Sequence, residues 1–126
     1  MDKKLNITID VRTNYLAERS NLKIPVYFFA YFINIQNNSS SMIQLLNRYW
    51  EINDANGNTK VVSGPGVIGR QPIIKSNNSF SYSSFCPLKT EFGFMEGYYE
   101  MIILPEKIKF KKNIDPFKLC CPNSIN

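Results

Sequence analysis

A glycine-rich stretch holds the residue types in this 126-residue chain that could most readily do chemistry. Gly64, Gly66 and Gly69 are spaced as G-x-G-x-x-G, and Arg70 and Gln71 follow them directly. Glycines let backbone amides approach a phosphate closely, and the arginine adds a positive charge. These five residues are therefore the candidate ligand-binding site, with a phosphate-containing molecule as the candidate ligand.

The glycine stretch lacks the context of a dinucleotide site. In such a site the glycines lead from a strand into a helix, and the N-terminus of that helix faces the phosphate. Here Pro72 and the apolar pair Ile73-Ile74 follow, and no helical pattern begins. A structural loop that needs positive φ angles or close backbone packing is the favoured interpretation. Phosphate or nucleotide binding stays open as the alternative, and no cofactor is expected.

Catalytic and metal-binding constellations are missing from the sequence. The chain has no histidine, which removes most zinc sites and the usual general base. The three cysteines, Cys86, Cys120 and Cys121, show neither metal-ligand spacing nor an activating base. No serine lies in a nucleophile elbow. The sequence therefore predicts a protein that is not an enzyme and has no metal site.

Composition and charge are those of an ordinary globular domain. The chain is 44% hydrophobic and 20% charged, which excludes a disordered protein, and its net charge of +5 favours acidic partners. The arginines are spread out and form no stripe with exposed aromatics, so there is no direct nucleic-acid signature. The odd cysteine count favours a reducing, cytoplasmic setting. We expect neither a signal peptide nor a membrane span.

The candidate site residues must be positioned by strands, because segments of alternating polar and apolar residues, or of apolar residues alone, fill the chain. Strands are expected at Leu5–Arg12, Val26–Ile35, Met42–Asn53, Thr59–Ser63, Ile73–Ile74, Phe80–Ser84, Met95–Leu104 and Lys107–Leu119. The second is apolar on both faces, which is typical of a central strand. Roughly seven to nine antiparallel strands without a convincing helix predict an all-β sandwich or barrel.

Arg48 disturbs the alternation of the third expected strand, because it falls on the same face as Leu46, Trp50 and Ile52. Two explanations stay open. Arg48 is either stacked and paired at the edge of the core, or a β-bulge shifts the register of the strand at this point.

Three residues are expected to support the fold: Trp50, Gly97 and Tyr99. Trp50 is compatible with an immunoglobulin-like core, although the paired core cysteines of that fold are missing. The hydroxyl of Tyr99 is predicted to bond back to the backbone of the corner at Leu88–Gly93. Tyr98 points the other way and is the candidate for an exposed aromatic contact.

Lys107, Lys109 and Lys111 alternate with apolar residues, and this spacing predicts that they share one face. The favoured interpretation is an edge strand whose charges prevent pairing with other chains. A surface for an acidic partner is the alternative. Exposed edge strands also make a homodimer reasonable.

Short blocks in a fixed order carry a family resemblance. They are Phe29-Ala30-Tyr31, Ile35-x-Asn37, Gln44-Leu45-Leu46-x-Arg48-Tyr49-Trp50-x-Ile52, Gly64-x-Gly66-Val67-Ile68-Gly69-x-Gln71-Pro72, Phe80-x-Tyr82-x-Ser84 and Gly93-x-Met95-x-Gly97-x-Tyr99-Glu100-Met101. Because these blocks occur in this order, the chain resembles the ApaG family, also called the DUF525 domain. Tyr98 departs from the family pattern, in which a histidine is frequent.

The resemblance implies a single ApaG-like domain over residues 1–126, folded as a fibronectin type III- or immunoglobulin-like β-sandwich. Similar domains occur in F-box proteins and in a polymerase-delta-interacting protein, which implies an interaction role. The bacterial family is associated with cobalt tolerance and magnesium efflux. The expected function is therefore non-enzymatic binding to an unknown protein partner. A phosphate- or nucleotide-binding protein that uses the Gly64–Gly69 loop is the alternative.

Overall fold

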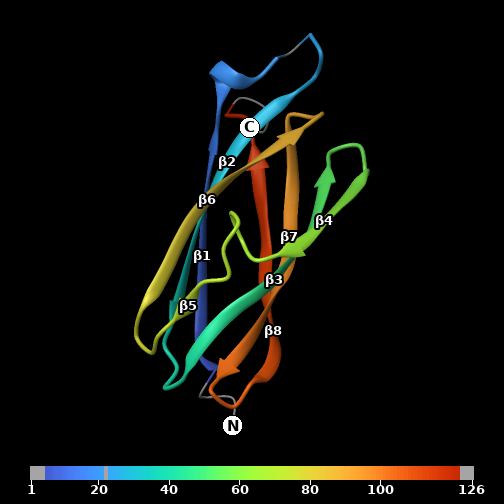
Figure 1. The fold of residues 1–126 in the computed structure, drawn as a ribbon. Coiled ribbons are helices and arrows are strands. Elements are labelled where there is room, and N and C mark those ends of the chain that lie inside the picture. Colours follow the sequence, from blue (N-terminus) through green and yellow to red (C-terminus); the bar gives the residue numbers. More distant parts are fainter. Residues whose placement is uncertain (1–4, 22, 123–126) are drawn as a thin grey trace.

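Two packed antiparallel sheets make up the part of the chain that the computed structural model describes, residues 5–21 and 23–122 (Figure 1). The elements are β1 (Ile7–Tyr15), the 3-10 helix η2 (Ala17–Arg19), β2 (Tyr27–Asn37), β3 (Met42–Asp54), β4 (Thr59–Pro65), β5 (Ile73–Ile74), β6 (Ser79–Leu88), β7 (Phe92–Leu104) and β8 (Ile108–Cys120). The predicted all-β sandwich is confirmed. Within these residues no helix is long and apolar enough to cross a membrane.

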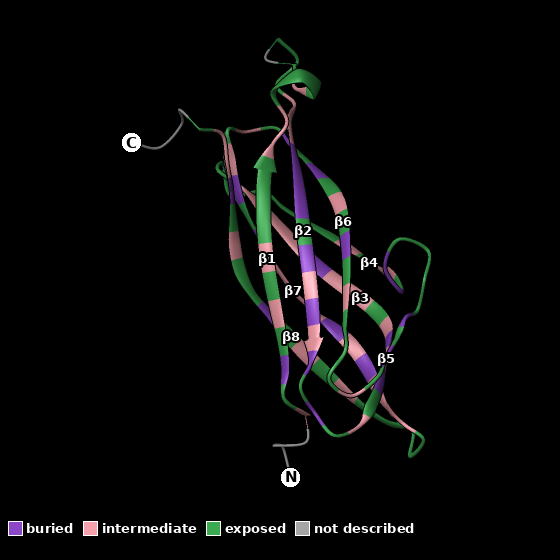
Figure 2. Cartoon of the chain, turned by 90° about the vertical axis from the view of Figure 1, so that its left-hand side faces the viewer, coloured by how far each residue is buried: buried purple, intermediate pink, exposed green. Residues whose placement is uncertain are grey.

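The two sheets differ in size. One has the strand order β1-β2-β6, and the other has the order β4-β3-β7-β8 with the short β5 paired to β3. Each of the eight expected segments forms a strand, with ends shifted by a few residues. The most apolar segment, β2, is central in its sheet as predicted, and it is buried along much of its length in Figure 2.

The core lies between the inner faces of the two sheets. Alternating side chains of β2, such as Phe29 and Ile33, face Trp50, Met101 and other apolar residues of the larger sheet. Trp50 is 2% exposed, and its ring meets the rings of Tyr31 and Phe117 edge-on at centroid distances of 5.7 Å. Burying one large apolar side chain contributes about 1.5–3 kcal/mol, so this layer is the main source of stability.

A β-bulge in β3 explains the position of Arg48. The pairing of β3 with β7 shifts register between Leu45 and Asn47, which leaves Leu46 as the extra residue. Leu45 faces the core before the bulge, and Trp50 faces it after the bulge. Arg48 is half-buried at the edge of the core. The two explanations given for its position, a bulge and a place at the core edge, therefore both apply.

Asn37 forms a buried polar centre that ties the end of β2 to β5. It is 0% exposed, and its side-chain nitrogen donates to the carbonyl oxygens of Ser41 at 2.8 Å and Ile74 at 2.9 Å. Its side-chain oxygen accepts hydrogen bonds from the backbone and the hydroxyl of Ser39. Because every bond of a buried amide is satisfied, this residue stabilises the turn.

The predicted partner of Tyr99 is wrong. Tyr99 is fully buried on β7, and its hydroxyl lies 2.5 Å from the hydroxyl of Tyr82 on β6 rather than against the corner backbone. This hydrogen bond joins the two sheets across the core. A buried hydroxyl needs a hydrogen-bond partner. Here that partner is Tyr82 on β6 and not the backbone of the corner.

The Tyr82–Tyr99 bond can be measured with phenylalanine variants. Tyr99→Phe leaves the buried Tyr82 hydroxyl without this partner, so we expect a loss of about 1–3 kcal/mol in the free energy of unfolding. The double change to Phe removes both hydroxyls and should cost less than the sum of the two single changes. Denaturant unfolding of the four proteins measures the coupling. Additive costs would show that the bond contributes nothing.

Stability should also fall at alkaline pH. Burial raises the pKa of Tyr82 and Tyr99 above the ordinary value of 10.0, and it raises the pKa of Cys86 to about 11. The unfolded chain loses these protons near their ordinary values while the folded chain keeps them. The stabilisation is therefore complete below about pH 9 and lost as the pH rises above it. Thermal unfolding from pH 7 to 11 tests this, and the double Phe variant should show a weaker decline.

Candidate functional site

The predicted glycine loop is fixed to the bulge of β3. The backbone N–H of Gly66 donates to the carbonyl oxygen of Leu46 at 2.8 Å, and the side-chain amide of Gln71 donates to the same oxygen at 2.9 Å. Arg48 Nη1 donates to the carbonyl oxygens of Pro65 and Gly66, each at 3.0 Å. The loop therefore takes its hydrogen bonds from its own sheet.

Each of the three glycines meets a local requirement. Gly64 lies against the guanidinium of Arg48, and a Cβ there would lie 3.3 Å from Nη1. A Cβ on Gly66 would overlap the carbonyl oxygen of Arg70, and Gly66 also has a φ of +62°. Gly69 has a φ of +76° in open space. The G-x-G-x-x-G spacing thus serves close packing and turn geometry.

The tip of the loop is a tight two-residue turn. Val67 and Arg70 exchange two backbone hydrogen bonds of 2.8 and 2.9 Å, and Ile68 and Gly69 between them have φ angles of 44° and 76°. Positive φ at both central residues is the type I′ geometry, in which Asn-Gly is preferred. Ile68 is therefore strained, and its side chain is 54% exposed.

Of the five predicted ligand-binding residues, Gly64 lies near the end of β4, and Gly66, Gly69, Arg70 and Gln71 lie in the loop that follows. The amides of Gly66 and Arg70, with that of Val67, already donate to carbonyl oxygens, and the Arg70 guanidinium lies 5.5 Å from the ring centroid of Phe80. Few amides are left for a phosphate, which disfavours that interpretation. Ligand binding here stays a prediction, and a pyrophosphate titration followed at the amides of residues 64–70 decides it.

A half-buried aromatic pair occupies the outer face of the larger sheet. Tyr49 on β3 and Tyr98 on β7 are directly opposite in register, and their rings stack at a centroid distance of 4.9 Å. The Lys111 ammonium on β8 lies 4.5 Å from the centroid of Tyr98. The fold thus brings together two residues, Tyr98 and Lys111, that the sequence singled out separately. We call Tyr49, Tyr98 and Lys111 the tyrosine surface.

Grooves of about 500 and 470 Å³ lie on either side of the tyrosine surface. In one of them Asn47 donates to Glu100 at 2.5 Å. In the other the Tyr49 hydroxyl donates to Glu51 at 2.9 Å, and this bond raises the pKa of Tyr49 above its ordinary value. These bonds hold the side chains around the ring pair in place.

The expected row of three lysines is wrong for Lys107. This residue has a φ of 65° in the turn before β8, so it does not share the alternation of the strand. Lys109 and Lys111 are exposed on β8, which is an edge strand of the larger sheet. The charged edge is thus two lysines long, and Lys111 also belongs to the tyrosine surface.

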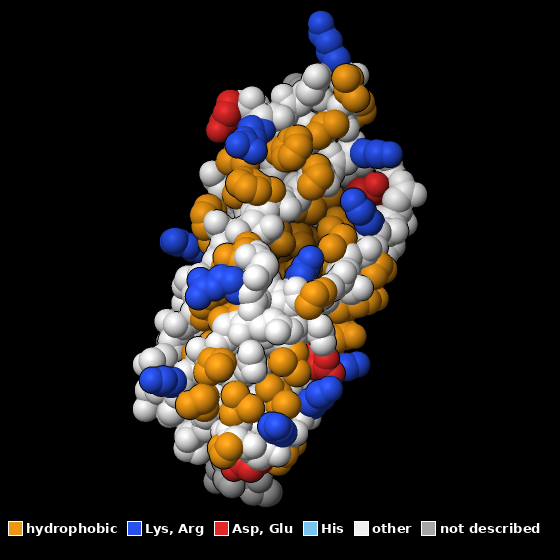
Figure 3. Space-filling view, viewed as in Figure 1, with side chains coloured by type: hydrophobic (Ala, Val, Ile, Leu, Met, Phe, Trp, Pro, Cys, Tyr) orange, Lys and Arg blue, Asp and Glu red, His pale blue; other side chains and the backbone are white. Residues whose placement is uncertain are grey.

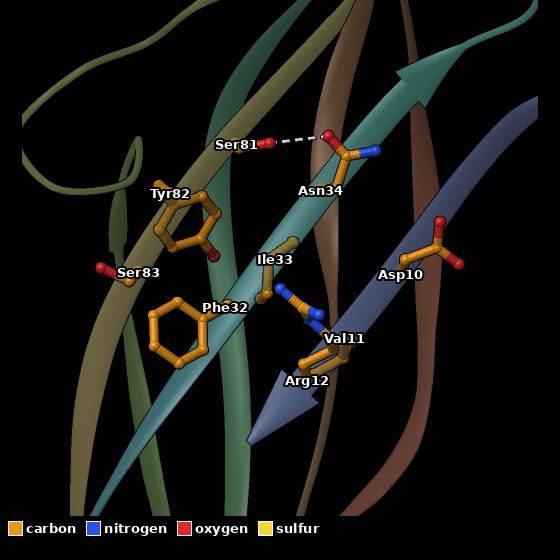
Figure 4. A pocket seen from close by; sticks show the side chains of 9 residues that line it. All are labelled: Asp10, Val11, Arg12, Phe32, Ile33, Asn34, Ser81, Tyr82 and Ser83. Carbon is orange, nitrogen blue, oxygen red and sulfur yellow. Dashed lines mark hydrogen bonds between the residues drawn. The ribbon is translucent and has the colours of Figure 1, made fainter. Parts of the chain in front are cut away.

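The smaller sheet carries a broad, shallow groove of about 800 Å³ on its outer face (Figure 4). Arg12 on β1 lies beside Phe32 on β2, and the Ser81 hydroxyl of β6 donates to Asn34 at 2.7 Å. Phe32 is 42% exposed. Sequence reasoning missed this surface because Arg12 and Phe32 meet only through strand pairing. Alternating polar positions on β1 and β6 were the available signal.

Reactive and metal-binding groups are sparse in residues 5–21 and 23–122. This part of the chain holds no group of three or more His, Cys, Asp or Glu side chains that could bind a metal ion. Cys86 is 2% exposed, and burial raises the pKa of its thiol to about 11. Its thiol is therefore protonated at neutral pH and a weak nucleophile.

The strained turn gives a stability prediction. Ile68→Asn should raise the free energy of unfolding by roughly 0.5–1 kcal/mol, because Asn tolerates positive φ and little burial is lost. Gly69→Ala should lower it by about 1 kcal/mol, since its Cβ meets no neighbour and only the backbone cost remains. Urea unfolding measures both variants. Destabilisation by Ile68→Asn would show that the Ile68 side chain makes a stabilising contact.

Comparison with known proteins gives one consistent result. Residues 17–103 match the family model of the ApaG domain, DUF525. Protein ApaG of Vibrio campbellii is 45% identical over 121 residues, which cover 95% of this chain and 94% of that protein. Protein ApaG of Beijerinckia indica is 40% identical over 119 residues, which cover 94% and 91%.

Solved structures agree with this assignment. A crystal structure of a Bordetella pertussis protein described as ApaA has a TM-score of 0.92 and 34% identity, over 97% of this chain and 98% of that one. The X-ray structure of a structural-genomics target has a TM-score of 0.90 and 36% identity, over 97% and 92%. The order of sequence blocks, the two-sheet fold and these matches show that the chain belongs to the ApaG (DUF525) family.

Proposed function

We propose that this protein is a non-catalytic binding domain that recognises a protein partner through the tyrosine surface. The observation that carries the proposal is the stacked pair of Tyr49 and Tyr98 with Lys111 over one ring. Tyrosines are enriched at binding hot spots because they offer a large, rigid area with a polar end. We also infer a cytoplasmic setting, which rests on the cysteine pattern of the sequence.

The surroundings of the tyrosine surface support this role. Strands β3, β7 and β8 position the three side chains on one rigid sheet, so little conformational entropy is lost on binding. The two grooves give a partner room to enclose the rings. Lys109 and Lys111 add positive charge at the sheet edge, which favours an acidic partner.

The association of the bacterial family with cobalt tolerance and magnesium efflux suggests that the partner belongs to a cation-transport system. We propose that the domain influences cation transport indirectly, by binding a protein of that system. The residues that make up the tyrosine surface offer an aromatic pair and an ammonium, which are not ligands for Co²⁺ or Mg²⁺.

Alanine variants test the surface. Tyr98→Ala should weaken partner binding by about 2 kcal/mol, roughly 30-fold in Kd, because a stacked aromatic at the centre of an interface is a typical hot spot. Raising the salt concentration should weaken binding further through Lys109 and Lys111. Affinity capture from host extract with the full chain identifies the partner, and calorimetry with that purified protein gives Kd.

Phe85→Ala is the matched control. Phe85 is an aromatic residue of similar size that is 54% exposed on β6, in the other sheet. It should leave Kd unchanged, and thermal unfolding of both variants checks that the fold is intact. An equal loss from both variants, or no loss from Tyr98→Ala, would contradict the proposal.

A further inference from the structure

A further groove, of about 520 Å³, opens between the two sheets on the side of β4 and β6. Among residues 5–21 and 23–122, β4 pairs only with β3 and β6 pairs only with β2, so the groove lies between edge strands of different sheets. It lies apart from the tyrosine surface, and none of the residues of that surface lines it.

The floor of this groove is apolar. Leu88 is 4% exposed, and Val26 and Ile52 are half-buried beside it. Ile52 also packs against the main core, so the floor continues the core toward the surface. Water in such a groove lies against apolar side chains, and an alkyl chain that displaces it is bound favourably.

The rim of the groove is charged. Lys60 lies on β4 and Lys89 directly follows β6, so each wall carries one exposed ammonium. Lys89 lies close enough to Asp54 to act on it electrostatically: the pKa of that carboxyl is lowered mainly by hydrogen bonds from Asn58 and also by the Lys89 charge. In Figure 3 hydrophobic side chains gather in the upper part of the face, with charged side chains of both signs at their border.

Asp54 is the acidic residue of the rim, and its carboxylate is occupied by the adjacent turn. One oxygen accepts the backbone N–H of Asn56 at 2.8 Å and that of Asn58 at 3.0 Å, and the other accepts the Asn58 side chain at 3.2 Å. Two lysines and one aspartate leave a net charge of +1 at the rim. The two lysines exceed the single carboxylate, and their ammonium groups can donate to an anion.

We infer that this groove binds a linear alkyl carboxylate, a medium-chain fatty acid. Its chain lies on Val26, Ile52 and Leu88, and its carboxylate is held by Lys60 and Lys89. The apolar floor and the two ammonium groups at its rim match the two parts of such a ligand, whereas an alkylamine of the same length would meet charge of its own sign.

The inference is tested by titrating the full chain with octanoate and decanoate, each below its micelle concentration, while backbone amide shifts are followed by NMR. We expect shift changes centred on residues 26, 52, 60, 88 and 89. Affinity should rise about two- to fourfold for each added methylene. Decanol and decylamine are the head-group controls, and decanoate should bind at least about threefold more tightly than decanol.

Charge reversal gives the decisive variant. Lys60→Glu combined with Lys89→Glu changes two exposed side chains, so the fold should survive, and decylamine should then bind in preference to decanoate. Lys75→Glu combined with Lys118→Glu is the matched control and should keep the preference for decanoate. Equal binding of decanol and decanoate, shift changes confined to other residues, or an unchanged preference in the Lys60/Lys89 variant would each overturn the inference.

Discussion

One extra residue in β3 organises much of this domain. Without the bulge at Leu46, the strand that points Leu45 into the core would turn Trp50 outward, because side chains alternate strictly along a regular strand. The bulge keeps both inside. It also leaves the Leu46 carbonyl free of the ladder to β7, and this oxygen accepts hydrogen bonds from Gly66 and Gln71. The core and the glycine loop thus depend on the same irregularity.

Neighbouring residues of β7 make different contacts on the two faces of the sheet. Tyr99 points inward and bonds Tyr82, whereas Tyr98 points outward and stacks on Tyr49. Gly97 lets β7 lie so close to β3 that a Cβ would overlap the Tyr49 carbonyl oxygen. That close contact fixes the two strands in register, and the register in turn holds the outer rings together.

Local patterns were sufficient to predict the strands, because alternation and turn residues act over a few positions. Contacts between distant residues were not predictable in this way. Nothing in the sequence around Asn37 indicates the Ile74 carbonyl to which its side chain donates. The predicted partner of Tyr99 was wrong because the Tyr99 hydroxyl bonds to Tyr82, which lies in the other sheet. The glycine spacing was ambiguous, because the bonds that distinguish a packed loop from a phosphate cradle come from the bulge of β3.

The turn at Ile68 and Gly69 has a practical consequence for protein engineering. The exchanged backbone bonds of Val67 and Arg70 close its base, and Val67 is buried at 1% exposure. The tip is exposed: Ile68 is 54% exposed, and a Cβ on Gly69 would meet no neighbour within 4 Å. A peptide epitope inserted between Ile68 and Gly69 would therefore be displayed from a clamped stem, and the domain could serve as a small, histidine-free presentation scaffold.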